Sequence, residues 1–319
     1  MDSALEKIAA SGLIPVVKID DPEQAVPLAR ALAKGGLRCI EITFRTTAAA
    51  AAIEAIRREV PEMLVGAGTV INTELARIAS DAGASFIVAP GFNPAVVEWC
   101  LEREIPVIPG VSGTAGIEQA LEMGIKTLKF FPAEVSGGTA MLDALAGPYP
   151  QLTFIPTGGI DLANMPSYLA KKNVLAVGGS WLSPKNLLES GGWDAIEALA
   201  REAVAAVHGF ELAHIGINQD NPEAASATAN LFSSFGFSPK EGNSSIFCGT
   251  SIEVMKQPFR GEMGHIAFRC RSIERALAYL ETKGFTGVQE TAKSDNGTLS
   301  VIYLDPEIGG FAVHLLRSR

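Results

Sequence analysis

A lysine in the middle of an apolar run is the first residue of this sequence that could do chemistry. Lys129 stands between Leu128 and Phe130 in the segment "KTLKFFP" (126–132). Lysine is almost never buried without a partner or a task. Either Lys129 reaches water along its flexible stem, or its amine is needed inside, where a lysine amine can attack a ketone carbon and form an imine.

The alternation of side chains along a strand indicates which residues face the interior. In "RCIEITFR" the apolar residues Ile40, Ile42 and Phe44 take the face toward the helices, which leaves the interior to Cys39, Glu41, Thr43 and Arg45. The same argument turns Lys129 and Phe131 inward and leaves Lys126 in solvent. Burial and Arg45 would then favour a neutral, nucleophilic amine on Lys129, and Glu41 would carry protons. A structural ion pair that plugs the interior is the alternative.

The elements that would position these residues repeat from residue 13 to about residue 180. Eight short apolar runs alternate with alanine-rich segments, in which Asp, Asn or Pro starts a helix and Gly often ends it. Such units pair in parallel through right-handed crossovers, and eight of them close into a (β/α)8 TIM barrel. An open doubly wound sheet is the alternative. Barrels carry their chemistry at the carboxyl ends of the strands, where this sequence places Glu41, Arg45, Thr69, Pro90, Lys129 and Phe131.

Two glycine pairs predict a phosphate site at the same edge. "TGGI" (157–160) ends the seventh predicted strand, and "GGSWL" (178–182) ends the eighth. These are the loops in which barrels commonly hold a phosphate through backbone N–H groups and a helix N-terminus. A side chain at the glycines would block that approach, and Ser180 adds a hydroxyl donor.

The composition changes after a final helix predicted over 193–209, which places a domain boundary near 208–211. The strand-like segments beyond it predict a smaller α+β domain, and the tail contains a loose internal repeat. "HIGINQDNPEAASATANLFSSFGF" and "HIAFRCRSIERALAYLETKGF" share the order of a His-led strand, a helix and a Gly-Phe pair.

Charge and composition exclude several classes of partner. The net charge is −9, the pI is near 5.1 and no run is rich in Lys and Arg, so a nucleic-acid partner is not expected. No segment approaches the roughly 18 apolar residues of a membrane span, and acidic residues stand where a signal peptide is basic. We therefore expect a cytoplasmic protein without a membrane partner. The four cysteines are widely spaced, which predicts reduced and mostly buried thiols: Cys39, Cys100, Cys248 and Cys270.

Six motifs, in order, resemble the 2-keto-3-deoxy-6-phosphogluconate (KDPG) aldolases, also called 4-hydroxy-2-oxoglutarate (KHG) aldolases. They are "EITFRT" (41–46), "GAGTV" (66–70), "PG" (90–91), "KFFPAE" (129–134), "PTGGI" (156–160) and "GGSWL" (178–182). The resemblance covers residues 1–208 and implies a class I aldolase, an aldehyde-lyase that needs no cofactor. It would cleave KDPG to pyruvate and glyceraldehyde 3-phosphate, and KHG to pyruvate and glyoxylate.

The resemblance also implies roles for individual residues. Lys129 would form the Schiff base with pyruvate, and Glu41 would act as acid and base through a water. Arg45 and Thr69 would hold the pyruvate carboxylate, while Pro90 and Phe131 would shape the pocket. The phosphate would bind at Gly158, Gly159, Gly179 and Ser180. The family is commonly trimeric, so a homotrimer formed by the barrels is expected. A phosphate-binding barrel isomerase, which needs no imine, is the alternative.

The tail, residues 211–319, is similar to the paired βαβββ modules of the glyoxalase and bleomycin-resistance superfamily. That similarity implies a divalent metal held by one residue from the first and last strand of each module: His214, Glu253, His265 and His314. The last position is usually Glu in the glyoxalases, so His314 is a departure. The tail would then be a metal-dependent isomerase, lyase or dioxygenase in a bifunctional protein. A noncatalytic binding or assembly module is the alternative.

Overall fold

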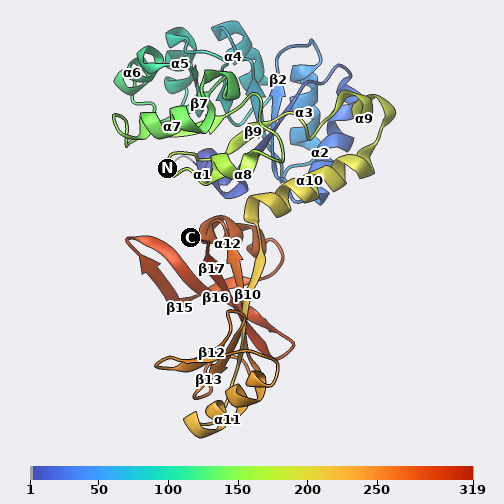
Figure 1. Ribbon diagram of the computed structural model, residues 1–319. Helices are drawn as coiled ribbons and strands as arrows, with labels where there is room; N and C mark the ends of the chain where they lie inside the picture. The colour runs from blue at the N-terminus through green and yellow to red at the C-terminus, as the bar shows by residue number, and fades with distance from the viewer. Residues whose placement is uncertain (1–2, 319) are drawn as a thin grey trace. The chain divides into compact units, whose positions relative to one another are not determined.

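The chain consists of two compact units, one ending at Val207 and the other beginning at His208. The structure is a computed structural model that describes residues 3–318 (Figure 1). In this part of the chain no helix is long and apolar enough to cross a membrane. All four cysteines are buried and free of disulfides, as their spacing predicted.

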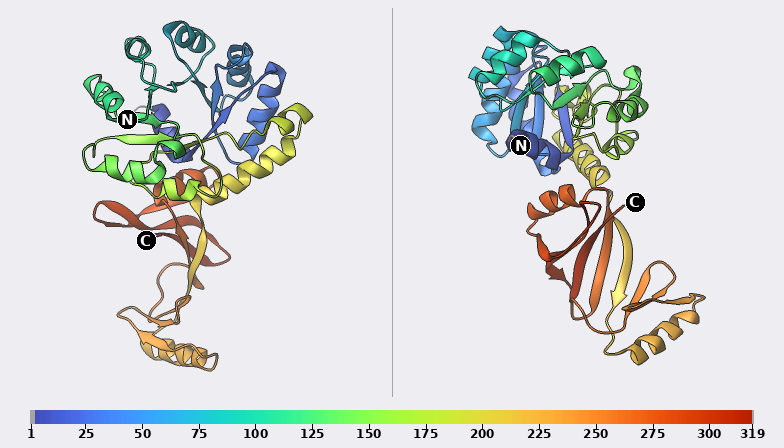
Figure 2. Two further views of the ribbon diagram at one scale, coloured as in Figure 1. Left: turned by 45° about the horizontal axis from the view of Figure 1, so that its top comes forward. Right: turned by 90° about the vertical axis from the view of Figure 1, so that its left-hand side faces the viewer.

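The first unit is a curled parallel sheet surrounded by helices (Figure 2). Six strands pair in the order β5-β4-β3-β2-β1-β9, and three more pair as β6-β7-β8. The strands are β1 (Leu13–Val17), β2 (Cys39–Thr43), β3 (Leu64–Gly68), β4 (Ile87–Val88), β5 (Val107–Ile108), β6 (Gly110–Val111), β7 (Thr127–Phe130), β8 (Thr153–Pro156) and β9 (Val177–Gly179). The apolar run "IPVIPG" (105–110), one of the eight expected to form a single strand each, forms two short strands separated at Pro109, which has no N–H to donate.

Helices alternate with these strands, as the sequence pattern predicted. Asn72 and Asn93 cap two of them, since their side chains accept hydrogen bonds from the backbone N–H groups of Leu75 and Ala95. The helices are α1 (Ser3–Ser11), α2 (Ala25–Lys34), α3 (Ala49–Glu59), α4 (Thr73–Asp81), α5 (Pro94–Leu101), α6 (Thr114–Glu122), α7 (Gly138–Ala146), α8 (Met165–Leu169), α9 (Lys185–Ser190) and α10 (Trp193–His208), with 3-10 turns at Pro22–Gln24 and Glu134–Ser136.

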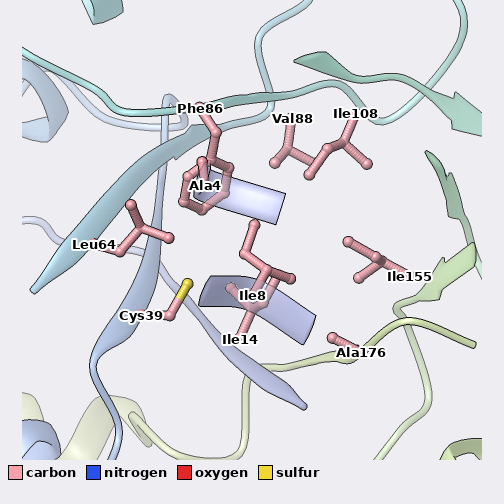
Figure 3. Close-up of a cluster of buried hydrophobic side chains, with 10 residues drawn as sticks. All are labelled: Ala4, Ile8, Ile14, Cys39, Leu64, Phe86, Val88, Ile108, Ile155 and Ala176. Carbon is pink, nitrogen blue, oxygen red and sulfur yellow. The ribbon is translucent and has the colours of Figure 1, made fainter. Parts of the chain in front are cut away.

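The core beneath the site is built around α1. Ala4 and Ile8 of this helix pack against side chains near the amino-terminal ends of the strands (Figure 3). The other residues of this cluster lie in the strands or directly before them: Ile14, Cys39, Leu64, Phe86, Val88, Ile108, Ile155 and Ala176. Cys39 belongs to it, so the next inward residue of β2, Glu41, lies one layer nearer the carboxyl ends of the strands.

The second unit repeats one order of elements, a strand, a helix and three strands. The first set is β10 (Glu211–Ile217), α11 (Pro222–Ser233), β11 (Pro239–Glu241), β12 (Ser245–Cys248) and β13 (Ile252–Met255). The second set is β14 (Gly264–Cys270), α12 (Ile273–Glu281), β15 (Thr286–Asp295), β16 (Thr298–Ile308) and β17 (Phe311–Arg317). All eight strands form one sheet in the order β11-β12-β13-β10-β14-β17-β16-β15, in which β10 and β14 pair antiparallel.

The two helices of this unit pack on one face of the sheet. Ala225 and Ala229 of α11 contact buried residues of β12 and β13, among them Val254. Ile273 and Ala276 of α12 contact buried residues of β14, β16 and β17 in the same way. Residues of opposite parity on these strands therefore lie on the other face of the sheet.

Candidate functional site

An ion pair lies inside the first unit. The Nζ atom of Lys129 on β7 donates a hydrogen bond to Oε1 of Glu41 on β2 at 3.2 Å, and the two side chains are only 7% and 3% exposed. The neighbours of Lys129 on its strand, Leu128 and Phe130, are buried among apolar side chains. A charged pair this deep must be compensated within the protein, so the curled sheet holds an amine and a carboxylate at contact distance away from bulk water.

A glycine on the adjacent strand makes room for the carboxylate. A Cβ atom on Gly68 would lie 2.0 Å from Oε1 of Glu41 and 2.6 Å from its Cδ. The next residue, Thr69, is partly buried and has a φ of 59°, a conformation that is uncommon outside glycine and concentrated at functional sites. Sequence reasoning placed Thr69 at this end of the strands but did not single out Gly68. The glycines of the motif "GAGTV" could have indicated a close approach by a neighbouring side chain.

Arg45 lies at the mouth of the site and not inside it. The inward orientation predicted for Arg45 is wrong, because β2 ends at Thr43 and strand alternation does not extend beyond it. The exposed Arg45 donates through Nε to Oγ1 of Thr43 at 3.2 Å, and Thr43 donates to the backbone oxygen of Val17 at 2.9 Å. Arg45 lines a depression of about 260 Å³ with Lys18, Ser180 and Lys185. Asp20 and Glu189 line the same depression and pair with Lys18 at 2.7 Å and with Lys185 at 3.5 Å. The positive charge available there to an anionic ligand is therefore mainly that of Arg45.

Pro90 and Phe131 line a second depression, of about 450 Å³, with residues 110–116. The ring centroid of Phe131 is 5.4 Å from Nζ of Lys129, so this depression adjoins the amine. The same ring lies against Gly158, where an added Cβ would be 3.2 Å away. The loop 110–116 therefore borders the space in which a substrate attached to Lys129 would extend.

The two predicted phosphate loops are held in place by their own contacts. Gly158 and Gly159 have φ values of 97° and 79°, which favour glycine. The Gly158 oxygen accepts from the backbone N–H of Glu134 at 3.1 Å, and the Gly159 oxygen accepts from Nδ2 of Asn164 at 2.8 Å. Gly179 has a further reason to be glycine, because a Cβ there would lie 1.7 Å from the ring of Trp181. Ser180, which follows it, is exposed.

Thr157 is a site residue that the sequence reasoning missed. Its side chain is buried, and within residues 3–318 its Oγ1 has no hydrogen-bond partner. It forms an isolated parallel bridge with Gly178, where a Cβ would lie 2.2 Å from that hydroxyl. Its position directly before the first glycine pair and its inward parity were the available signals. A buried hydroxyl without a hydrogen-bond partner is suited to bind a ligand that supplies a donor or an acceptor.

A family model described as KDPG and KHG aldolase matches residues 5–199, more than half of the chain. The chain belongs to the KDPG and KHG aldolase family. It is 52% identical over 204 residues to a 2-dehydro-3-deoxy-phosphogluconate aldolase of Treponema pallidum, which covers 64% of this chain and 96% of that relative. It is 47% identical over 203 residues to the KHG/KDPG aldolase of Escherichia coli, which covers 63% of this chain and 95% of that relative.

Solved structures of this aldolase family agree with the sequence comparison. The KDPG aldolase of Legionella pneumophila, with pyruvate captured as a covalent carbinolamine, aligns with a TM-score of 0.61 at 40% identity and covers 63% of this chain and 98% of that one. The enzyme of Zymomonas mobilis with 3-phosphoglycerate gives 0.60 at 38% identity and covers 64% and 96%. The match of the aldolase family model ends before the second unit.

A cluster of three histidines and a glutamate lies on one face of the second sheet, outside the aldolase match. Nε2 of His214 is 3.1 Å from Nε2 of His265, and both atoms are 3.2 Å from Oε2 of Glu253. One nitrogen from each of His214, His265 and His314 lies within 4.8 Å of the others. The structure thus brings together the four residues that the sequence selected, from the neighbouring strands β13, β10, β14 and β17.

The titration behaviour of this histidine cluster suits metal ligands. Burial, with the neighbouring His265 and His214, lowers the pKa of His314 to about 3, so its imidazole is neutral near pH 7. Burial raises the pKa of Glu253, but hydrogen bonds from His214, His265 and Ser245 outweigh it and hold that pKa far below its usual range. Within residues 3–318 neither ring nitrogen of His314 has a hydrogen-bond partner. Neutral imidazoles and a carboxylate are the ligand types of divalent transition metals.

Proposed function

We propose that the first unit is a Schiff-base aldolase that cleaves KDPG to pyruvate and glyceraldehyde 3-phosphate, and KHG to pyruvate and glyoxylate. The observation that carries the proposal is the buried contact between Nζ of Lys129 and Oε1 of Glu41 at 3.2 Å. An isomerase of sugar phosphates needs no buried amine, so this pair favours the aldolase. The names of the relatives, and the covalent carbinolamine in the Legionella enzyme, support the same activity.

The proposed reaction begins when the neutral amine of Lys129 attacks the C2 carbonyl of the substrate. The amine is neutral because the Lys129 ammonium has first passed a proton to Glu41. A proton moves from the attacking nitrogen to the carbonyl oxygen, and Glu41 then gives its own proton to the departing hydroxyl, so that loss of water leaves a protonated imine and an ionised Glu41. Glu41, through a water, then removes the proton of the C4 hydroxyl, and the C3–C4 electron pair moves into the protonated imine. The aldehyde leaves, Glu41 returns a proton to C3 of the enamine, and hydrolysis releases pyruvate and the amine.

The remaining site residues are assigned to binding. We assign Arg45 and Thr69 to the carboxylate of the keto acid, and Pro90 and Phe131 to the walls of its pocket. The phosphate is assigned to the glycine loops and the hydroxyl beside them, Gly158, Gly159, Gly179 and Ser180. The guanidinium of Arg45 and the hydroxyl of Ser180, which line one depression, support an anionic substrate.

Reduction with borohydride in the presence of pyruvate is expected to attach a three-carbon adduct to Lys129. The reason is that Lys129 lies inside beside Glu41, whereas Lys126 precedes the strand and is exposed. Peptide mass mapping of the reduced protein makes the measurement, and protein treated with borohydride alone is its control. An adduct on Lys126, or no adduct at all, would contradict the imine mechanism.

We also propose that the parallel strands close into a (β/α)8 barrel and that the protein forms a homotrimer through it. In support of closure, β5 and β6 are separated by Pro109 alone, and parallel bridges join Phe154 to Val174 and Thr157 to Gly178 between β8 and the β9 region. The proposal of a homotrimer rests on the membership of the first unit in the aldolase family.

We further propose that residues 211–319 form a domain of the glyoxalase and bleomycin-resistance type that binds a divalent metal through His214, Glu253, His265 and His314. The repeated βαβββ order and the pairing of β10 with β14 support the domain type. The converging imidazoles, with ring nitrogens of His265 and His314 that lack partners in the described chain, fit the metal. When bound, such a metal supplies Lewis acidity toward an oxygen ligand. This would make the protein bifunctional, whereas a metal-free tail would leave only binding or assembly roles.

Metal analysis of the purified protein is expected to find about one zinc, iron, nickel or manganese ion per chain after incubation with each ion. The double variant His214→Ala, His265→Ala is expected to hold none, because it removes two of the three histidine ligands. Aldol cleavage by the variant should match the parent, because both substitutions lie outside the first unit. Equal metal in both proteins, or none in the parent, would reject the site.

A further inference from the structure

We propose that Ser245 is the positioning residue of this histidine cluster and fixes Glu253 as a ligand that offers one oxygen only. The inference rests on the metal site proposed above. It concerns a residue that neither the repeat pattern nor the ligand types identified. What points to it is a short hydrogen bond on the side of Glu253 that faces away from the histidines.

The carboxylate of Glu253 divides its two oxygens between different partners. Oε1 accepts a hydrogen bond from the Ser245 hydroxyl at 2.6 Å. Oε2 lies 3.2 Å from the Nε2 atoms of both His214 and His265. With one oxygen bound to Ser245, the carboxylate cannot turn both oxygens toward the imidazoles at once.

Ser245 is itself held firmly in the sheet. It is 5% exposed and begins β12, where it pairs with Met255 of β13, two residues beyond Glu253. Residues that pair directly across two strands share a face, so Ser245 lies on the face that carries the cluster. Gly216, which pairs with both Glu253 and His265, leaves this face free at the centre, because a Cβ there would lie 2.0 Å from Cε1 of His265.

The orientation has a consequence for coordination. A residue that hydrogen-bonds to a metal ligand, without touching the metal itself, orients that ligand. Removal of such a residue lowers the metal affinity about 10–100-fold. Three imidazoles and a carboxylate that binds through one oxygen would occupy four coordination positions of a metal. A metal that prefers six ligands would then keep two positions for oxygen atoms of a substrate or water. If Ser245 were absent, Oε1 would be free to compete for one of them.

The test compares Ser245→Ala with the parent by two measurements on the full chain. The dissociation constant for Co²⁺, from competition with a chelator, is expected to rise about 10–100-fold. At saturating Co²⁺, the visible absorption spectrum of the variant is expected to differ from that of the parent, because the carboxylate changes its binding mode. A loss of stability alone would not change the spectrum of the saturated site.

Two control variants accompany this test. Ser245→Thr keeps the hydroxyl and is expected to restore both the affinity and the spectrum. Ser300→Ala removes a hydroxyl of the same sheet that donates to the backbone oxygen of Lys293, and it is expected to change neither. Equal affinity and equal spectra for Ser245→Ala and the parent would overturn the role of Ser245 and leave the metal site standing. A parent that binds no Co²⁺ would overturn both.

Discussion

Replacement of Lys129 by methionine is expected to lower aldol cleavage by several orders of magnitude and also to destabilise the first unit. Activity is lost because the imine cannot form without the amine. Stability is lost because Glu41, whose side chain is 3% exposed, would remain buried without its cation. Removal of one partner from a buried ion pair typically costs about 3–5 kcal/mol. Pyruvate release and the thermal unfolding midpoint are the two measurements.

The double variant Lys129→Met, Glu41→Gln separates these two effects. It removes both charges, so most of the lost stability should return while aldol cleavage stays absent. If Lys129→Met alone were as stable as the parent, water would have to reach Glu41 and solvate its charge. Cleavage that survives in either variant would exclude Lys129 as the Schiff-base residue.

Gly68→Ala is expected to lower the turnover number about 10²–10⁴-fold, the usual contribution of a positioned acid or base. The added Cβ would occupy the place of Oε1 of Glu41, 2.0 Å away, and force the carboxylate from Lys129. The amine itself is not displaced, so borohydride should still trap pyruvate on Lys129, although more slowly because Glu41 also carries protons during imine formation. Turnover of KDPG is measured beside the yield of the trapped adduct.

Gly147→Ala is the matched control for this variant. Gly147 ends α7 with a φ of −67°, and the nearest atom to an added Cβ is a backbone oxygen 3.9 Å away. Alanine fits there without strain, and activity should be unchanged. Near-normal turnover in Gly68→Ala would mean that Glu41 can act from another position, which contradicts the role proposed for its present one.

Sequence reasoning located the buried pair because β2 and β7 are regular over the residues that matter. Alternation along each strand brought Glu41 and Lys129 to the interior, although they are 88 residues apart. The same reasoning failed at Arg45, two residues beyond the end of β2. It could not reveal the role of Gly68, which depends on the register between β2 and β3 and on the space that remains between side chains.

The histidine cluster shows the same limit in the second unit. The repeat and the scarcity of histidine selected the four residues from the sequence. A register shift between Leu212 and His214 on β10 sets where His214 falls against β14. An extra residue of this kind turns the following side chains to the other face of a strand and leaves no mark in a sequence pattern. The contacts of about 3 Å within the cluster therefore had to come from the structure.

The packing of α1 across the amino-terminal ends of the strands bears on the order in which products leave. Ala4 and Ile8 fill that end with apolar side chains, and Glu41 lies directly above this layer. If the keto acid is attached to Lys129 as proposed, it lies near this closed end, and the aldehyde fragment extends from it toward the solvent. The shape of the site then requires the aldehyde to leave before pyruvate. The covalent chemistry requires the same order of release.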